Sequence, residues 1–192
     1  MPYQPVVDSD IAFFKTIIGP DQVLVDAESR QRYGRDETEN LVFPPEVVLK
    51  PSTTEEISAI MKHCNQRCIP VTPRGAGTGL SGGALPHLGG VSLSMERLNR
   101  ILQIDERNLQ VTVEPGVITE VLQNAVKEKG LFYPPDPSSR GSCFIGGNIA
   151  ENSGGPKAVK YGVVKDYVLN LEVVLPNGSV MWTGANVLKN ST

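Results

Sequence analysis

The sequence has no apolar run near the ~18 residues that a membrane-spanning helix requires. Its first eight residues, Met1 to Asp8, lack both the basic region and the apolar core of a secretory signal. The net charge of −3 argues against the general attraction of a basic surface for nucleic acid or anionic membranes. These absences predict a cytoplasmic protein without a nucleic-acid partner.

Cysteine and histidine are also scarce. The three cysteines, Cys64, Cys68 and Cys143, form an odd and sparse set that predicts reduced thiols. Cys64 and Cys68 lie one helical turn apart beside His63, which raises the alternative of a metal site. Adjacent helical residues such as His63 and Cys64 face different ways, however, and no second ligand pair lies nearby. We therefore predict ordinary packing and no metal.

The composition itself is that of a folded domain. With 192 residues, 40% of them apolar and 20% charged, the chain suits one ordinary domain or two small lobes. Residues 1–44 are predicted to form an N-terminal helical extension, with a helix over 8–18 that ends at Gly19-Pro20. The polar stretch 35–40 favours a solvated surface loop.

The segment from residue 46 to residue 72 has the pattern of a βαβ unit. Short apolar runs at 46–51 and 68–72 predict two strands. Between them, Thr53-Thr-Glu-Glu56 fits a helix capping box. The following apolar residues recur at helical spacing and predict one buried face: Ile57, Ile60, Met61 and Cys64. The two strands of such a unit should be parallel, with a right-handed crossover.

The second half has a more antiparallel pattern. The expected elements are a strand over 90–94, a hairpin of 101–105 with 109–114, a helix over 118–129 with apolar Val121, Leu122, Ala125 and Val126 before a Gly130 cap, and a hairpin of 168–175 with 179–182 closed by an Asn-Gly turn. We therefore predict an α+β fold of two lobes, a small βαβ lobe followed by a more antiparallel one.

Glycine is concentrated in two windows. Seven of the 19 glycines lie in 75–90 and six in 141–162. Repeated glycine is expected where the backbone needs a positive φ or where another group closely approaches the main chain. The stretch 73–83, Pro-Arg-Gly-Ala-Gly-Thr-Gly-Leu-Ser-Gly-Gly, follows a predicted strand, has Arg74 near its start and contains no acidic residue. Its N–H groups predict a nest for an oxyanion, and a diphosphate is the expected ligand.

Two common phosphate-binding motifs do not fit this loop. Gly77-x-Gly79-x-x-Gly82 matches the dinucleotide-binding fingerprint literally, but that fingerprint must open a helix. Further glycines and Pro86 interrupt any helix after the loop. No Gly-Lys-Ser/Thr ends the stretch, which excludes a Walker loop. A flexible surface loop is the alternative, disfavoured by the preceding strand and the lack of acidic residues.

Several motifs, in the right order, resemble FAD-linked oxidases of the vanillyl-alcohol oxidase/p-cresol methylhydroxylase type. Within that group the sequence is most similar to the branch of the glycolate oxidase D-subunit, D-lactate dehydrogenase and D-2-hydroxyglutarate dehydrogenase. The resemblance covers roughly residues 45–184 and rests on the segments 73–84, 113–117, 133–139, 145–156, 160–167 and 171–178. It implies that residues 45–192 form a two-lobed FAD-binding domain of the p-cresol methylhydroxylase type.

The resemblance also implies which residues contact the FAD. Amides from Gly75 to Leu80 would hold the diphosphate, the residues around Pro135 and Gly146 would line the flavin side, and the main chain near Glu172 would meet the adenine. The full implied set is Arg74, Gly75, Ala76, Gly77, Thr78, Gly79, Leu80, Ser81, Gly82, Pro135, Asp136, Ser138, Ser139, Gly146, Gly147, Asn148, Ser153, Glu172 and Val173. Alternatives are that Pro135 only fixes a turn, that Asn148 only bonds its own backbone and that Glu172 points outward.

One departure concerns how the cofactor is attached. Related enzymes that attach FAD covalently often carry a histidine in this loop, where this sequence has Thr78. No histidine lies between His63 and His87. We therefore expect non-covalent FAD.

The resemblance implies oxidation of a D-2-hydroxy acid, with hydride passing to flavin N5, since the cofactor carries the redox chemistry. Catalytic residues are expected in a cap domain or a partner subunit beyond Thr192, so this chain alone should turn over little substrate. Any membrane association would be peripheral, through electron-transfer partners. The alternatives are a same-fold enzyme, of the alkylglycerone-phosphate synthase or sugar-lactone oxidase kind, and a non-catalytic flavin-binding module. A nicotinamide-dependent enzyme ranks last.

Overall fold

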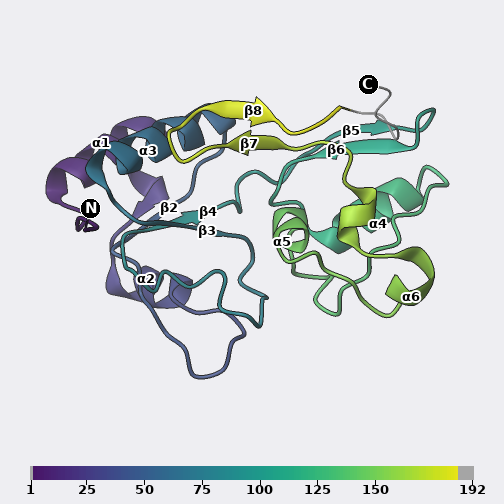
Figure 1. Ribbon diagram of the computed structural model, residues 1–192, viewed down its shortest axis with the longest axis horizontal. Coiled ribbons are helices and arrows are strands. Elements are labelled where there is room, and N and C mark those ends of the chain that lie inside the picture. The colour runs from purple at the N-terminus through teal and green to yellow at the C-terminus, as the bar shows by residue number, and fades with distance from the viewer. Residues whose placement is uncertain (1, 186–192) are drawn as a thin grey trace.

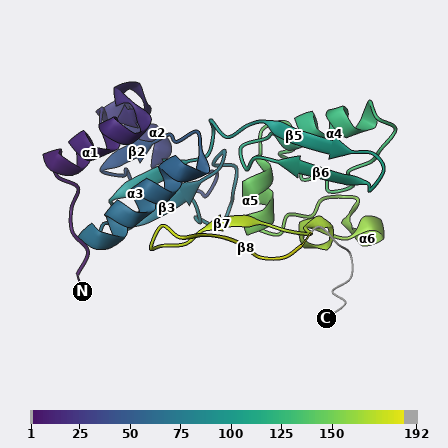
Figure 2. The same ribbon diagram turned by 90° about the horizontal axis from the view of Figure 1, so that it is seen from above.

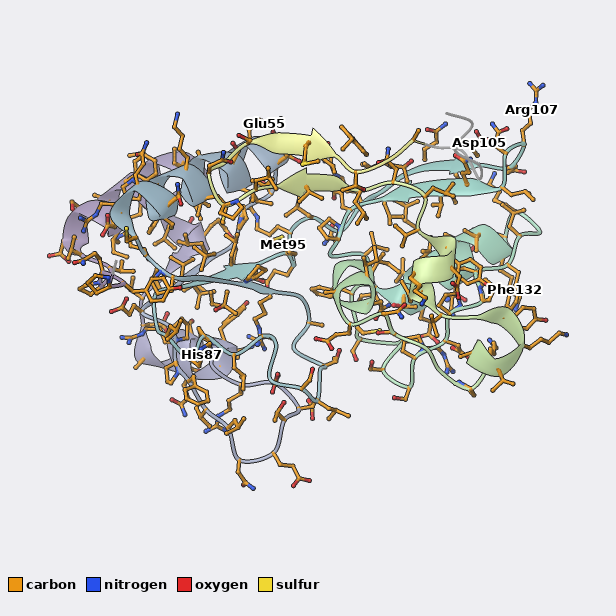
Figure 3. All side chains as sticks on the ribbon, viewed as in Figure 1. Glu55, His87, Met95, Asp105, Arg107 and Phe132 are labelled. Atoms are coloured by element: carbon orange, nitrogen blue, oxygen red, sulfur yellow. The ribbon has the colours of Figure 1, made fainter. Side chains whose placement is uncertain are left out.

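The computed structural model describes residues 2–185, which form two lobes joined after Met95 (Figures 1 and 3). The last part of the predicted domain, residues 186–192, lies outside the described residues. The first lobe contains α1 (Asp8–Ile18), η1 (Pro20–Gln22), β1 (Val23–Leu24), α2 (Ala27–Tyr33), β2 (Val47–Leu49), α3 (Thr54–Arg67), β3 (Val71–Arg74) and β4 (Val91–Ser94). The second contains β5 (Ile101–Asp105), β6 (Gln110–Val113), α4 (Thr119–Lys127), α5 (Ile145–Ala150), α6 (Ala158–Tyr161) and η2 (Val164–Tyr167), and the hairpin of β7 (Glu172–Val174) and β8 (Val180–Trp182) follows. Across residues 2–185, no helix is long and apolar enough to cross a bilayer.

The sheet of the first lobe has the order β1-β2-β4-β3. Strands β2, β4 and β3 are parallel, and β1 joins the edge antiparallel to β2. The parallel orientation expected for β2 and β3 is confirmed, but β4 lies between them. The prediction that grouped residues 90–94 with the antiparallel lobe is wrong. All four residues of β4 are buried, because a central parallel strand is covered on both faces.

Helices α1 and α3 cover one face of this sheet, and α2 lies on the other side (Figure 1). The core packs Phe14 of α1 and Ile60 of α3 against Val47, Leu49 and other strand residues. The predicted apolar face of α3 is confirmed. Because α1 and β1 contribute to this core, residues before position 45 are packed into the first lobe. The predicted domain boundary at 44/45 itself stays a prediction.

Two side chains at the start of α3, those of Thr53 and Glu56, accept hydrogen bonds from backbone N–H groups. The Thr53 hydroxyl accepts a hydrogen bond from the Glu56 N–H, as the capping pattern predicts. The Glu56 carboxylate reaches one residue further back than in the usual box and accepts from the Ser52 N–H at 2.6 Å. The helix ends at Arg67 and is capped by Cys68, whose φ of +54° belongs to the left-handed region, so β3 begins at Val71 rather than at residue 68.

A buried carboxylate joins α1 to α3. Asp10 is 1% exposed, and its oxygens lie 2.8 Å from His63 Nε2 and 3.1 Å from Arg67 Nε. Asp10 also accepts a hydrogen bond from the Val7 N–H at 3.0 Å. Burial alone would raise the pKa of Asp10, but the hydrogen bonds from Arg67, Val7 and His63 together lower it.

This lowered pKa makes the stability of the first lobe depend on pH. We expect Asp10→Asn to lower the free energy of unfolding by about 2 kcal/mol near neutral pH, because it removes the charged acceptor. A carboxyl with a lowered folded-state pKa stabilises the fold above its ordinary pKa and loses this effect as the pH falls through the folded value. The difference between wild type and variant should therefore shrink from about pH 5 towards pH 3 in urea denaturation. A difference that is unchanged at low pH would contradict this account.

The second lobe has its own apolar core. Val117, Leu122, Val126 and Ile145 are buried and pack with the β5–β6 hairpin. Val121, one of the apolar residues of the predicted helix, is 51% exposed, because α4 turns Thr119, Leu122 and Val126 inward. Gly130 has a φ of +70°, and the Leu131 N–H bonds the Val126 carbonyl, as expected for the predicted glycine cap.

The β7–β8 hairpin is not confined to the antiparallel lobe in which the sequence analysis placed it. Its turn lies beside α3, and its two strands extend toward the second lobe (Figures 1 and 2). The Ser58 hydroxyl of α3 donates to the Gly178 carbonyl at the turn. A Cβ on Gly178 would lie 2.6 Å from the Ser58 carbonyl oxygen, so this close contact requires glycine. The predicted Asn-Gly turn is therefore also an attachment point between the hairpin and the first lobe.

Candidate cofactor-binding site

Arg74 ends β3 and places a positive charge directly beneath the first glycine loop. Its side chain is only 8% exposed, and a Cβ on Gly77 would lie 2.2 Å from its Nη2. Nη1 is buried and makes no hydrogen bond among residues 2–185. Burial lowers the pKa of Arg74, but a guanidinium keeps its proton at any physiological pH. A buried cation with an unused donor favours an anionic ligand at this position.

The backbone N–H groups of the first glycine loop are also free to bind a ligand. In the part of the chain that the structure describes, no N–H group from Gly75 to Leu80 donates a hydrogen bond. Gly77 and Gly82 have φ values of +76° and +75°, which explains why glycine is needed at both positions. No helix follows the loop before β4, so the reason for excluding the dinucleotide fingerprint is confirmed. Free amides above a guanidinium, without acidic residues in 75–90, suit a diphosphate.

The two glycine windows, some seventy residues apart, meet in space. A Cβ on Gly75 would lie 3.8 Å from the backbone N and Cα of Gly147 in α5. The Ser81 hydroxyl donates to Glu151 Oε2 at 3.1 Å, just after the same helix. The first loop therefore lies against α5, and the structure brings Gly75, Ser81 and Gly147 into one region.

The glycines of this region serve different purposes. A Cβ on Gly146 would lie 2.7 Å from Pro115 Cβ, so this residue permits close packing inside the protein. Nothing lies within 4 Å of a Cβ placed on Gly79 or on Gly147. Space above the main chain at these two positions leaves room for a bound molecule.

The side chain of Asn148, in α5, belongs to a buried hydrogen-bonded group, and the half-buried Ser153 bonds the Asn148 main chain. Asn148 Nδ2 lies 2.5 Å from the Thr119 hydroxyl, which also contacts Cys143 Sγ at 3.2 Å. The Ser153 N–H donates to the Asn148 carbonyl at 2.9 Å. The side chain of Asn148 therefore bonds another side chain, in contrast to the alternative that it bonds only its own backbone.

The turn at residues 135–139 is held in place by contacts with other residues of the second lobe. The Pro135 carbonyl accepts from Gln123 Nε2 at 2.8 Å, and Asp136 forms an ion pair with Lys157 at 3.0 Å. The hydrogen bond from Lys157 lowers the pKa of Asp136. A Cβ on Gly155 would lie 2.0 Å from the Asp136 carbonyl oxygen, which fixes the turn against the second glycine window. Ser138 is exposed and Ser139 half-buried at the end of this turn.

Glu172 and Val173 lie apart from these segments, in β7. The Glu172 side chain is exposed and accepts a hydrogen bond from the Thr54 hydroxyl at the start of α3. This arrangement agrees with the alternative of an outward-facing strand residue as far as the side chain is concerned. The expected main-chain role near the adenine stays a prediction.

Four residues at the site were missed by the sequence reasoning. Tyr33 stacks beneath Arg74, with the Arg74 Cζ 5.4 Å from the ring centroid, and its hydroxyl donates to Glu96 at 2.5 Å. The Glu37 N–H donates to the Gly79 carbonyl at 3.1 Å, and Glu151 accepts from Ser81. These contacts join segments far apart in the chain, so no local pattern could have indicated them.

The chain is similar in sequence and in fold to known flavoproteins and to their relatives. The chain is 48% identical to the glycolate oxidase subunit GlcD of Bacillus subtilis over 174 residues, which cover 91% of this chain and 37% of that protein. It is 42% identical to the D-lactate dehydrogenase of Anaerostipes hadrus, covering 99% and 40%. The solved structure of p-cresol methylhydroxylase with substrate bound superposes with a TM-score of 0.71 at 26% identity, covering 92% and 35%. The predicted fold class is thereby confirmed.

These relatives are longer proteins, and the chain spans about two-fifths of the length of the curated ones it matches. The family match itself covers residues 45–184, which include both glycine windows and all the predicted site residues. Since this region is well over half of the 192 residues, the chain belongs to the FAD binding domain family, and FAD is its cofactor.

Proposed function

We propose that the diphosphate of FAD binds on the amides from Gly75 to Leu80, above the guanidinium of Arg74. The observation that carries this proposal is the combination of six unused N–H groups with a buried, unpaired guanidinium nitrogen. Both are hydrogen-bond donors that would gain charge-assisted bonds to phosphate oxygens. Ala76 and Thr78 would contribute through their main chain, and the role of their side chains is secondary.

The remaining positions would follow the cofactor away from the diphosphate. Ser81 and Gly82 continue from the loop toward the flavin, and α5 lies against the same loop. Gly147, with open space over its Cα, would be approached directly, whereas Gly146 and Asn148 would support it from behind. Pro135, Asp136, Ser138 and Ser139 would line the flavin side, and the main chain of Glu172 and Val173 would meet the adenine.

We further propose that the whole protein oxidises a D-2-hydroxy acid. The support is the identity of 42–48% to a glycolate oxidase subunit and a D-lactate dehydrogenase. FAD, when bound, supplies the hydride acceptor, and the protein supplies binding and orientation. A same-fold enzyme of other chemistry and a non-catalytic flavin-binding module are the rival functions. Anaerobic bleaching of the bound flavin by D-lactate or glycolate, but not by L-lactate, would distinguish the proposed function from both.

Binding itself is tested by gel filtration of the purified protein after incubation with FAD. We expect the visible flavin absorbance to elute with the protein, since the diphosphate site requires no other component. Complete separation of flavin from protein, at concentrations where the protein is folded by circular dichroism, would contradict the proposal.

The attachment of FAD is expected to be non-covalent, because this sequence has Thr78 in the loop where related enzymes that attach FAD covalently often carry a histidine. Precipitating the loaded protein with acid should therefore release all the yellow colour to the supernatant. Flavin that stays in the washed pellet would show a covalent bond and contradict this prediction.

A further inference from the structure

Tyr33 is fixed at both ends on the side of the sheet that carries α2 (Figure 1). It is the last residue of α2 and is buried. Its hydroxyl donates to Glu96 Oε2 at 2.5 Å, and Glu96 also accepts from the Ser94 hydroxyl and pairs with Lys50 at 2.5 Å. Burial raises the pKa of Tyr33 to about 12, so the ring stays a neutral phenol. The orientation of this ring is therefore set by the fold and not by the ligand.

The neutral ring supports Arg74 without cancelling its charge. A buried guanidinium is ordinarily paired with a carboxylate, because an unpaired charge is costly to bury. Arg74 forms no ion pair within residues 2–185 and instead lies over the face of Tyr33, a favourable cation–π contact. Asp36 and Glu96 act on Arg74 electrostatically without forming an ion pair with it, and its Nη1 donors remain available to a ligand near Gly77.

A second contact from the same segment reaches the glycine loop at Gly79. The Phe43 N–H donates to the Gly34 carbonyl at 2.8 Å and closes the chain between them into a loop. Within that loop the Glu37 N–H donates to the Gly79 carbonyl at 3.1 Å. The stretch predicted to be only a solvated loop therefore holds the glycine loop directly.

From these contacts we infer that residues 33–43, which precede the matched family region, belong to the cofactor site. Tyr33 is a positioning residue that holds the Arg74 guanidinium beneath the diphosphate, and the Glu37 main chain holds the loop at Gly79. The inference rests on the proposed diphosphate site. It assigns to the segment before residue 45 a direct part in cofactor affinity as well as a structural part.

The test uses FAD and ADP, because ADP carries the diphosphate without the flavin ring. Tyr33→Met keeps a long apolar side chain but removes the ring, and we expect it to weaken both ligands by about tenfold. Tyr33→Phe keeps the ring and should restore affinity to within about twofold of wild type. In an Arg74→Met background, Tyr33→Met should have no further effect, because the two residues act through one contact. Gln31→Leu, on the exposed face of α2, is the control.

Glu37→Pro provides a second variant that leaves the core unchanged. Proline removes the N–H that bonds Gly79, so affinity for FAD and ADP should fall several-fold, on the order of one lost hydrogen bond. Glu39→Pro, in the same exposed loop, is the matched control. Dissociation constants come from quenching of flavin fluorescence, with ADP measured by competition.

The outcomes separate two claims. If wild-type protein binds neither ligand, the proposed diphosphate site fails. If wild type binds both, but Tyr33→Met and Glu37→Pro stay within twofold of it, the inference about residues 33–43 is overturned. Equal losses from Tyr33→Met with and without Arg74 would also overturn it, because they would show a structural effect that does not act through the guanidinium.

Discussion

Replacing Gly77 with alanine is expected to weaken FAD binding by about 100-fold or more. The residue has a φ of +76°, and an added Cβ would lie 2.2 Å from Arg74 Nη2 and 2.7 Å from its Cζ. The methyl group would force the buried guanidinium out of its contact with Tyr33 and would strain the loop at the same time. Both consequences fall on the groups that we propose to hold the diphosphate, so the loss should appear in affinity more than in stability.

The control for this variant is Gly130→Ala. Gly130 also has a positive φ, of +70°, but nothing lies within 4 Å of its added Cβ. Gly130 follows the end of α4 in the second lobe. The Gly130→Ala variant should be less stable than wild type because of backbone strain, but it should keep its affinity for FAD. Titration of flavin fluorescence together with thermal unfolding measures both quantities. An unchanged dissociation constant in Gly77→Ala would show that FAD does not depend on this part of the loop.

Phe14→Ala is expected to have the largest effect on stability, a loss of about 3–5 kcal/mol in the free energy of unfolding. Phe14 is 0% exposed and packs, from α1, into the core of the first lobe. Its truncation leaves a cavity between α1 and the sheet. The variant tests whether the segment before residue 45 is an integral part of the lobe, which the family match alone does not address.

Phe132→Ala is the matched control in the second lobe. Phe132 is 58% exposed (Figure 3) and contacts Tyr161 edge-on, so its truncation should cost about 1 kcal/mol or less. Urea denaturation followed by circular dichroism gives both values. Similar small losses for the two variants would mean that α1 contributes little to the core.

Much of the fold could be predicted from local patterns. The limits of α1, the Thr53 cap and the glycine cap at Gly130 depend on neighbouring residues, and each is present in the structure. The position of β4 between β2 and β3 could not be predicted in this way. Its burial comes from two partner strands and from layers on both faces, and the small polar Ser92 and Ser94 concealed that environment.

The site shows the same division. The glycine loop and Arg74 were recognisable, because positive φ, free amides and a cation follow from the residue types themselves. The role of Tyr33 could not be recognised in the sequence, because its contacts with Arg74 and Glu96 are made only by the folded chain. Gly146 has a structural reason that its motif did not indicate. Its motif implied a place at the cofactor, which stays a prediction, and the structure adds close packing against Pro115.

The central claim is that FAD binds through the main chain of the first glycine loop and the adjoining end of α5. Its most direct test is a titration of the isotopically labelled protein with FAD, followed by the chemical shifts of the backbone amides. We predict the largest shifts for the N–H groups from Gly75 to Leu80, with further shifts at Gly147. Saturable FAD binding that leaves the loop amides unchanged and shifts only amides elsewhere would contradict the account.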